Sequence, residues 1–377
     1  MLLFLLLLLV AGIALSLPAV QTRIAKELMT KINTSYGTSI EIDEVAISVF
    51  GGVKLKKVLI KDHHKDTLIY ANRIKTNLIG IKKVIDGDLI FNSIHLDGLL
   101  FHLKTYKKEK LTNLDVFIEA FETGKPSTKP FLMTVREAFI SNGHFLLIDE
   151  NRRDPKDVDF TRLNAQISNF QILGPEVETN INQLSFKDHR GVFLKKLTAK
   201  FSYNKKRIRL KNLELATSES KLKGDVQLNY KIEDFADFNN KVKFDIKLKS
   251  SVIASNDIRC FYDELGKNLF FNARSRIEGT LNNLKLTDLV LFDRKGSKII
   301  GSINFKNLFP SKSQEFYMNG KFRSLTTTYD HLVAILPNVL GESLPEILKK
   351  IGKVDLVGST ELTTKNIQAD FSMKTDI

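Results

Sequence analysis

The residues with the greatest potential for chemistry lie together at positions 62–66, which are Asp-His-His-Lys-Asp. Imidazole and carboxylate groups are common ligands of zinc and other divalent metals. Adjacent residues of a strand point to opposite faces, so we do not expect His63 and His64 to share one metal ion. The segment is polar and lies between two apolar stretches, which favours a hairpin turn. The sequence therefore predicts no metal site.

Other candidates for chemistry are weaker. The acidic residues of 149–159 lack the glycine and the spacing of a calcium loop, and Arg152 and Arg153 interrupt them. Cys260 is the single cysteine, and no histidine accompanies it in a known nucleophile motif. The chain contains no Walker loop, GxGxxG, GxSxG or HExxH motif. We predict a protein that is not an enzyme and that needs no cofactor.

Composition favours an anionic partner. The chain has 377 residues, 43% of them hydrophobic, a formal net charge of +14 and a pI near 9.5. Nucleic acid, a membrane surface and lipid headgroups are the partners that such charge attracts. The 26 phenylalanines lie mainly on the apolar side of alternating segments, opposite the lysines. Single strands bind where rings and charge share one surface, so we expect no nucleic-acid partner.

Alternation of apolar and polar residues dominates the chain from residue 37 onward. In residues 241–250, for example, four apolar side chains alternate with lysines and one aspartate. This pattern predicts a strand with one apolar face and one charged face. Short turn sequences separate many such segments, which favours an antiparallel sheet. Helical periodicity predicts insertions at about 112–122 and 329–352, and we expect helices at the ends or edges of the sheet.

An internal repeat supports an extended array of β modules. The motif Ser-Lys-x-x-Gly occurs at residues 220–224 and again at 297–301, within similar segments that begin at Leu210 and Leu286. The chain ends at residue 377 within a strand pattern, so we expect the natural protein to continue.

The first twenty residues form an uncharged apolar run. At about 1.5 Å per residue this run would span the ~30 Å hydrocarbon core of a bilayer. A cleaved signal peptide is the alternative, but no small-x-small cleavage motif stands near Pro18. We predict a retained transmembrane anchor at 1–20, helical over residues 2–17. Basic residues follow the run instead of preceding it, but large domains translocate largely regardless of charge.

Residues 21–36 have the pattern of an amphipathic helix. Val20, Ile24, Leu28 and Ile32 recur every four residues, and basic residues occupy the other faces. The helix could pack on the first strands as a plug or lie among lipid headgroups.

The order of these segments resembles a known family. An apolar anchor and a helix precede a pattern made of Ile40-x-Ile42, Val45-x-Ile47, Phe50, Gly52, Leu55-x-x-Val58-x-Ile60-x-Asp62, Asp66-Thr67-Leu68 and Ala71. This pattern resembles the N-terminal part of the AsmA-like superfamily, in particular the TamB (translocation and assembly module) branch of Gram-negative cell envelopes. Residues 96–103 and 184–225 look like the same family.

The resemblance implies a fold and a function. The fold would be mainly β: a long twisted antiparallel sheet forming an open, taco-like groove of repeated modules over 37–377. An N-terminal inner-membrane helix would leave the bulk of the chain in the periplasm. The implied function is phospholipid transport between inner and outer membranes, and the alternative is a scaffold for outer-membrane protein assembly, translocation and secretion. Implied partners are the inner membrane, phospholipid acyl chains and an outer-membrane assembly-factor barrel, the last through a C-terminal domain absent here.

Alternation alone favours closed β-sandwiches, in which apolar faces pack against each other. The anchor, the repeat and the resemblance favour the open groove instead. If the groove is open, the apolar residues of each strand line the concave side. The lysines that alternate with them face solvent. The residues expected to line the concave side are Phe101, Leu103, Phe201, Tyr203, Val226, Leu228, Tyr230, Val242, Phe244, Ile246, Leu248, Ile303 and Phe305.

Overall fold

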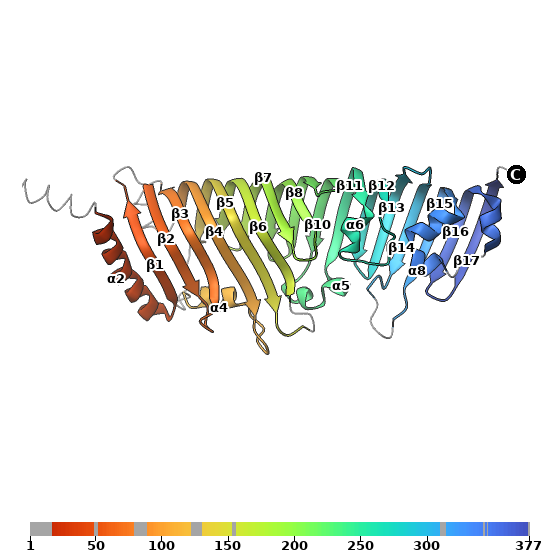
Figure 1. Cartoon of the computed structure of the whole chain (residues 1–377). Helices are drawn as coiled ribbons and strands as arrows, with labels where there is room; N and C mark the ends of the chain where they lie inside the picture. Colours follow the sequence, from red (N-terminus) through yellow and green to blue (C-terminus); the bar gives the residue numbers. More distant parts are fainter. Residues whose placement is uncertain are drawn as a thin grey trace, which may run out of the picture. The chain divides into compact units, whose positions relative to one another are not determined.

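The computed structural model describes residues 17–48, 52–78, 89–121, 130–152, 156–309, 314–341, 344 and 346–375 (Figure 1). The chain divides into two compact units, which we call unit 1 (Met1–His189) and unit 2 (Arg190–Ile377).

Unit 1 begins with a helix and continues mainly as strands. Its elements are α2 (Pro18–Tyr36), β1 (Ser39–Ile47), β2 (Gly52–Lys61), β3 (Thr67–Leu78), β4 (Leu89–Thr105), α4 (Asn113–Glu119), β5 (Leu132–Asp149), β6 (Lys156–Leu173) and β7 (Glu176–Asp188). Thr112 caps α4 through a capping box with Asp115, which explains why this helix begins where it does.

The described residues of unit 2 form ten strands, with short helices between some of them. Its strands are β8 (Phe193–Asn204), β9 (Arg207–Ala216), β10 (Lys221–Asn229), β11 (Lys243–Ala254), β12 (Phe270–Thr280), β13 (Asn283–Asp293), β14 (Lys298–Lys306), β15 (Tyr317–Thr328), β16 (Lys353–Thr363) and β17 (Ile367–Thr375). Its helices are η1 (Ile232–Asp237), α5 (Phe238–Lys241), α6 (Ser255–Arg259), α7 (Tyr329–Ile335), α8 (Pro337–Leu340) and η2 (Glu346–Ile351).

The strands belong to one 17-stranded sheet, in which all described strand pairs except β4–β5 are antiparallel. The prediction of a mainly β chain with one mostly antiparallel sheet and few short helices is therefore confirmed. The β4–β5 pair is parallel because a long connection containing α4 returns the chain to the same end of the sheet. Parallel neighbours require such a crossover, whereas the short turns elsewhere produce antiparallel pairs.

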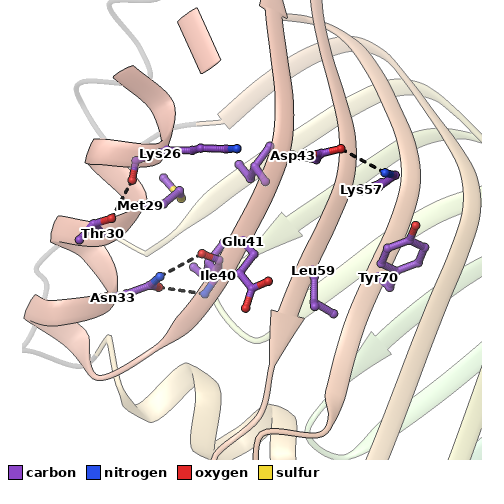
Figure 2. A pocket seen from close by; sticks show the side chains of 11 residues that line it. Lys26, Met29, Thr30, Asn33, Ile40, Glu41, Asp43, Lys57, Leu59 and Tyr70 are labelled. Atoms are coloured by element: carbon purple, nitrogen blue, oxygen red, sulfur yellow. Dashed lines mark hydrogen bonds and ion pairs between the residues drawn. The ribbon is translucent and has the colours of Figure 1, made fainter. Parts of the chain in front are cut away.

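Helix α2 covers the outer edge of β1 (Figure 1). The side chain of Asn33 accepts a hydrogen bond from the backbone N–H of Ile40 and donates to its carbonyl oxygen, both at 2.9 Å (Figure 2). Thr22 makes the same pair of bonds with Val45, at 2.9 and 3.2 Å. These side chains replace a neighbouring strand and so satisfy an edge that would otherwise be open to pairing.

β-Bulges change which residues face each side of unit 2, and those in β9 and β13 are two examples. Asn212 in β9 and Asp288 in β13 have φ of 52° and 49°, and each adds one residue opposite the neighbouring strand. The extra residue reverses the alternation, so the apolar side chains on either side of each bulge point the same way. The Asp225 carboxylate accepts a hydrogen bond from the N–H of Asn212, and this bond lowers the pKa of Asp225.

The two copies of the Ser-Lys-x-x-Gly motif occupy comparable places. Ser220 and Ser297 are both buried in the turns that precede β10 and β14. Ser220 donates to Asp257 in α6, and the Ser297 hydroxyl lies 3.1 Å from Nδ1 of His331 in α7. Ser220 thus holds α6, which follows β11. Ser297 holds α7, which follows β15.

Candidate functional site

Strand register places the apolar residues of unit 2 on one face of the sheet. Residues directly paired across neighbouring strands point to the same side. One row of paired residues runs through Phe201, Leu210, Val226, Ile246, Ile277, Leu286 and Ile303. The adjacent row runs through Tyr203, Ile208, Leu228, Phe244, Gly279, Leu284, Phe305, Met318, Leu362 and Ile367. We call these two rows, with Leu248, the apolar face of unit 2.

The opposite side of the same strands is charged. Lys243, Lys247 and Lys249 alternate with residues of the apolar face in β11, and all three are exposed. Lys249 pairs with Asp225 of β10 at 3.6 Å. Such exposed pairs contribute little to stability, and their main effect is to keep this side of the sheet hydrated.

The apolar face is incompletely covered over β8–β11. Phe201, Val226, Leu228 and Ile246 remain half-buried even though they lie in the interior of their strands. In a closed sandwich core, such side chains would be almost wholly buried by the facing sheet. Part of each of these side chains is therefore accessible from outside the protein.

Helices α7 and α8 cover the same face nearer the C-terminus. Leu340 of α8 is buried with Phe316 and Leu362, and Leu332 and Leu336 pack on this cluster. A second buried cluster lies on the face nearby and consists of Leu289, Ile303, Phe322 and Leu325. The prediction that helices lie only at ends or edges is therefore wrong here. A leucine at every fourth position from 332 gives the segment an apolar side, which is buried by contact with the sheet.

The residues predicted to line a groove fall into three groups. Those on the apolar face of unit 2 are Phe201, Tyr203, Val226, Leu228, Phe244, Ile246, Leu248, Ile303 and Phe305. Ile303 is buried in the cluster just described, and Phe244 contacts Phe238 of α5 with ring centroids 5.9 Å apart. These two positions are therefore less available to a ligand than their neighbours.

Tyr230 and Val242 lie in the connection between β10 and β11 instead of in the strands. Val242 is 0% exposed. The rings of Tyr230 and of Phe235 in η1 are in edge contact, with centroids 4.6 Å apart. Burial raises the pKa of Tyr230 to about 12, and its hydroxyl donates to the carbonyl oxygen of Asn204. Both side chains contact protein, so they hold the connection in place and do not extend the open part of the face.

Phe101 and Leu103 lie in unit 1, where β4 pairs in parallel with β5. Phe101 is paired with Phe145, and the rings of Phe145 and Phe160 lie 6.2 Å apart. Phe160 in turn stacks on Phe186, with centroids 3.8 Å apart. Unit 1 therefore carries an aromatic row across four strands. The sequence-based prediction omitted three of its members. Phe160 and Phe186 lie in alternating segments, whereas Phe145 begins a run of four apolar residues.

A buried polar cluster holds the β2–β3 turn, and its centre is Asp62. This residue is 5% exposed, and its carboxylate accepts hydrogen bonds from the N–H groups of His64 and Asp66, from Asn113 Nδ2 and from the Tyr106 hydroxyl. The same hydroxyl lies 2.9 Å from Asp66, and this hydrogen bond is the main cause of the lowered pKa of Asp66. Asp62 and Asp66, two polar positions of the pattern that resembles the AsmA-like superfamily, therefore have a structural role.

His63 and His64 contact one common carboxylate, so the prediction that they cannot share a site is wrong. Residues 62–66 form the predicted turn, and a turn does not send neighbouring side chains to opposite faces. Nε2 of His63 and Nε2 of His64 lie 2.9 and 2.7 Å from the two carboxylate oxygens of Glu109. Hydrogen bonds from both histidines, with His64 the stronger, lower the pKa of Glu109.

A further hollow of about 640 Å³ lies between α2 and strands β1–β3 (Figure 2). Met29, Leu59 and Tyr70 form part of its wall, and a Lys57–Asp43 ion pair of 3.2 Å crosses the other part. The mixture of lining residues does not select one class of ligand.

No model of a protein family matches the chain, and no curated protein matches it. The resemblance to the AsmA-like superfamily therefore stays a prediction.

The predicted membrane anchor lies almost entirely outside the described residues, which begin at residue 17. Among the described helices, none has both the length and the hydropathy needed to span a bilayer.

Proposed function

We propose that the chain is an inner-membrane-anchored periplasmic protein of the AsmA-like superfamily, similar to TamB. In this proposal its apolar β faces carry phospholipid acyl chains between the inner and outer membranes. The observation that carries the proposal is the half-burial of Val226, Leu228 and Ile246 on a continuous apolar face of unit 2. The order of anchor, helix and alternating segments adds the membrane context.

An apolar surface of this kind suits the energetics of lipid movement. Exposing one CH₂ group to water costs about 0.8 kcal/mol, so two chains of roughly sixteen carbons face a barrier of about 25 kcal/mol. A protein surface that replaces water along each chain lowers this barrier without any covalent step. The exposed lysines on the opposite side keep the protein hydrated while the apolar side is occupied.

The alternative function, a scaffold for outer-membrane proteins, requires a sheet edge that can pair with an incoming strand. At β1 the edge is already satisfied, because Thr22 and Asn33 bond its backbone groups. This observation favours the lipid proposal over strand addition at that edge.

Two neighbouring residues provide a matched test. Ile246 lies on the apolar face, and Lys247 lies next to it on the exposed side. We expect native mass spectrometry of gently extracted protein to detect bound phospholipid in the wild type and in Lys247→Asp. Ile246→Asp should lose most of that lipid, because the new carboxylate would contact acyl chains. A wild type without phospholipid, or equal lipid content in both folded variants, would refute the proposal.

A further inference from the structure

His63, His64 and Glu109 form a group of metal-ligand atoms in unit 1. Their ligand atoms all lie within 4.8 Å of one another. The two imidazole rings are in edge contact, with centroids 4.5 Å apart, and both present Nε2 to the Glu109 carboxylate. Two imidazoles and one carboxylate are a ligand set that zinc uses in proteins.

The turn that carries the histidines is held rigidly. Asp62 N–H donates to the carbonyl oxygen of Asp66, and Lys65 N–H donates to that of Asp62, both at 2.9 Å. Lys65 has a φ of 66°, which closes the turn. The buried Asp62 carboxylate accepts the N–H of His64 at 3.0 Å. The backbone of the histidine pair is therefore fixed independently of any ion.

The segment that carries Glu109 is fixed in a comparable way. Glu109 N–H donates to the Tyr106 carbonyl oxygen at 3.0 Å, and Lys108 between them has a φ of 71°. Asn151 Nδ2 donates to the carbonyl oxygens of Tyr106 and Glu109, at 3.2 and 3.0 Å. This asparagine anchors the segment to the connection after β5.

Tyr106 joins the two turns. Its hydroxyl lies 2.7 Å from the Asp62 carboxylate, and its ring lies against the His64 ring with centroids 3.8 Å apart. The His63 ring meets the same tyrosine edge-on at 5.5 Å. Preorganisation of this kind is what a specific metal site requires, since loosely held ligands lose affinity.

We propose that His63, His64 and Glu109 bind one zinc ion, with solvent completing the coordination. At metal–ligand distances of 2.0–2.2 Å, the ligand atoms of a tetrahedral site are about 3.3 Å apart. The Nε2–carboxylate distances of 2.9 and 2.7 Å lie below this value, and the limit of 4.8 Å on every ligand-atom separation lies above it, so rotation of the three side chains can bring their ligand atoms to it. The ion would replace the hydrogen bonds between histidines and carboxylate, and would cross-link the β2–β3 turn to the segment after β4.

The test uses the full chain without an affinity tag, with zinc chloride as the probe in isothermal titration calorimetry at pH 7.5. We expect one zinc ion per chain in the wild type. His63→Gln, His64→Gln and Glu109→Gln should each weaken binding at least tenfold, because each removes one of three ligands. His95→Gln is the matched control, since His95 stacks on Phe139 in the same unit away from this site.

Circular dichroism in the absence of zinc verifies that each variant is folded, and Co²⁺ provides a second measurement. Its visible absorption should show a low-symmetry site in the wild type and in His95→Gln, and should weaken in the three ligand variants. The proposal is overturned if the wild type does not bind zinc. It is also overturned if folded ligand variants bind zinc as tightly as the wild type.

Discussion

The difference between covered and open parts of the apolar face can be measured with one substitution made at two leucines. Leu228 is half-buried on the face at β10, and Leu325 lies in the buried cluster at β15. Both belong to unit 2, so unfolding of the same unit reports on both. The change to aspartate is identical in chemistry, and only the surroundings of the new carboxylate differ.

The structure predicts very different costs. Leu325 is 7% exposed, and truncating such a leucine costs about 2–5 kcal/mol before any charge is buried. Burial of an unpaired carboxylate adds several kcal/mol, so we expect Leu325→Asp to lose more than about 4 kcal/mol. Leu228 is only partly buried, so its change to aspartate loses most of the ~2 kcal/mol from leucine burial, but the carboxylate stays in contact with water. The expected loss there is about 1–2 kcal/mol.

Urea unfolding followed by far-ultraviolet circular dichroism measures both costs. Leu228→Asp should retain its β spectrum at ordinary temperature with a modestly lower midpoint, whereas Leu325→Asp should be largely unfolded. If Leu228→Asp unfolded as readily as Leu325→Asp, the face at β8–β11 would be a closed core. The reasoning from half-burial to an accessible lipid surface would then be refuted.

Three further predictions concern the connection after α6, the contact between Tyr106 and Asp66, and the edge of β1. Gly266→Ala should destabilise unit 2 and increase proteolysis after α6, because an added Cβ would overlap the carbonyl oxygen of Ala334; unchanged protease resistance would contradict this. Tyr106→Phe should destabilise the chain at pH 6 more than at pH 3, as measured by urea unfolding. The reason is that the tyrosine lowers the pKa of Asp66 below 3.8, a contribution present above that pH and lost as pH falls; an equal loss at both pH values would contradict it. Asn33→Leu should expose the edge of β1 and promote self-association in size-exclusion chromatography, whereas a monodisperse variant would show that this cap is unimportant.

Strand existence and the apolar side of most strands could be predicted because alternation is a direct consequence of strand geometry. Alternation did not show where a bulge shifts the apolar positions of a strand by one residue. In β9 the apolar side passes from Leu210 to Leu213, and in β13 from Leu286 to Leu289, each across a bulge. Two consecutive polar residues inside an alternating segment are the signal that could have revealed these bulges.

The packing of α7 and α8 on the apolar face and the cluster of His63, His64 and Glu109 both depend on long-range contacts. A local sequence pattern cannot predict such contacts. The sequence predicted helical residues near 332–340 but not the strands on which they pack. His63 and Glu109 are far apart in the chain, and they meet only because Tyr106 and Asp62 join two turns. Strand geometry does not apply to His63 and His64, because the polar segment that contains them forms a turn.

The most direct test of lipid transport along the apolar face is photo-crosslinking in membranes. A photoreactive residue is introduced at Val226, on the face, and separately at Gln227, on the opposite side of the same strand. We expect a phospholipid adduct, identified by mass spectrometry, at position 226 and little or none at position 227. Equal labelling at both positions, or no lipid adduct at position 226 in folded protein, would contradict it.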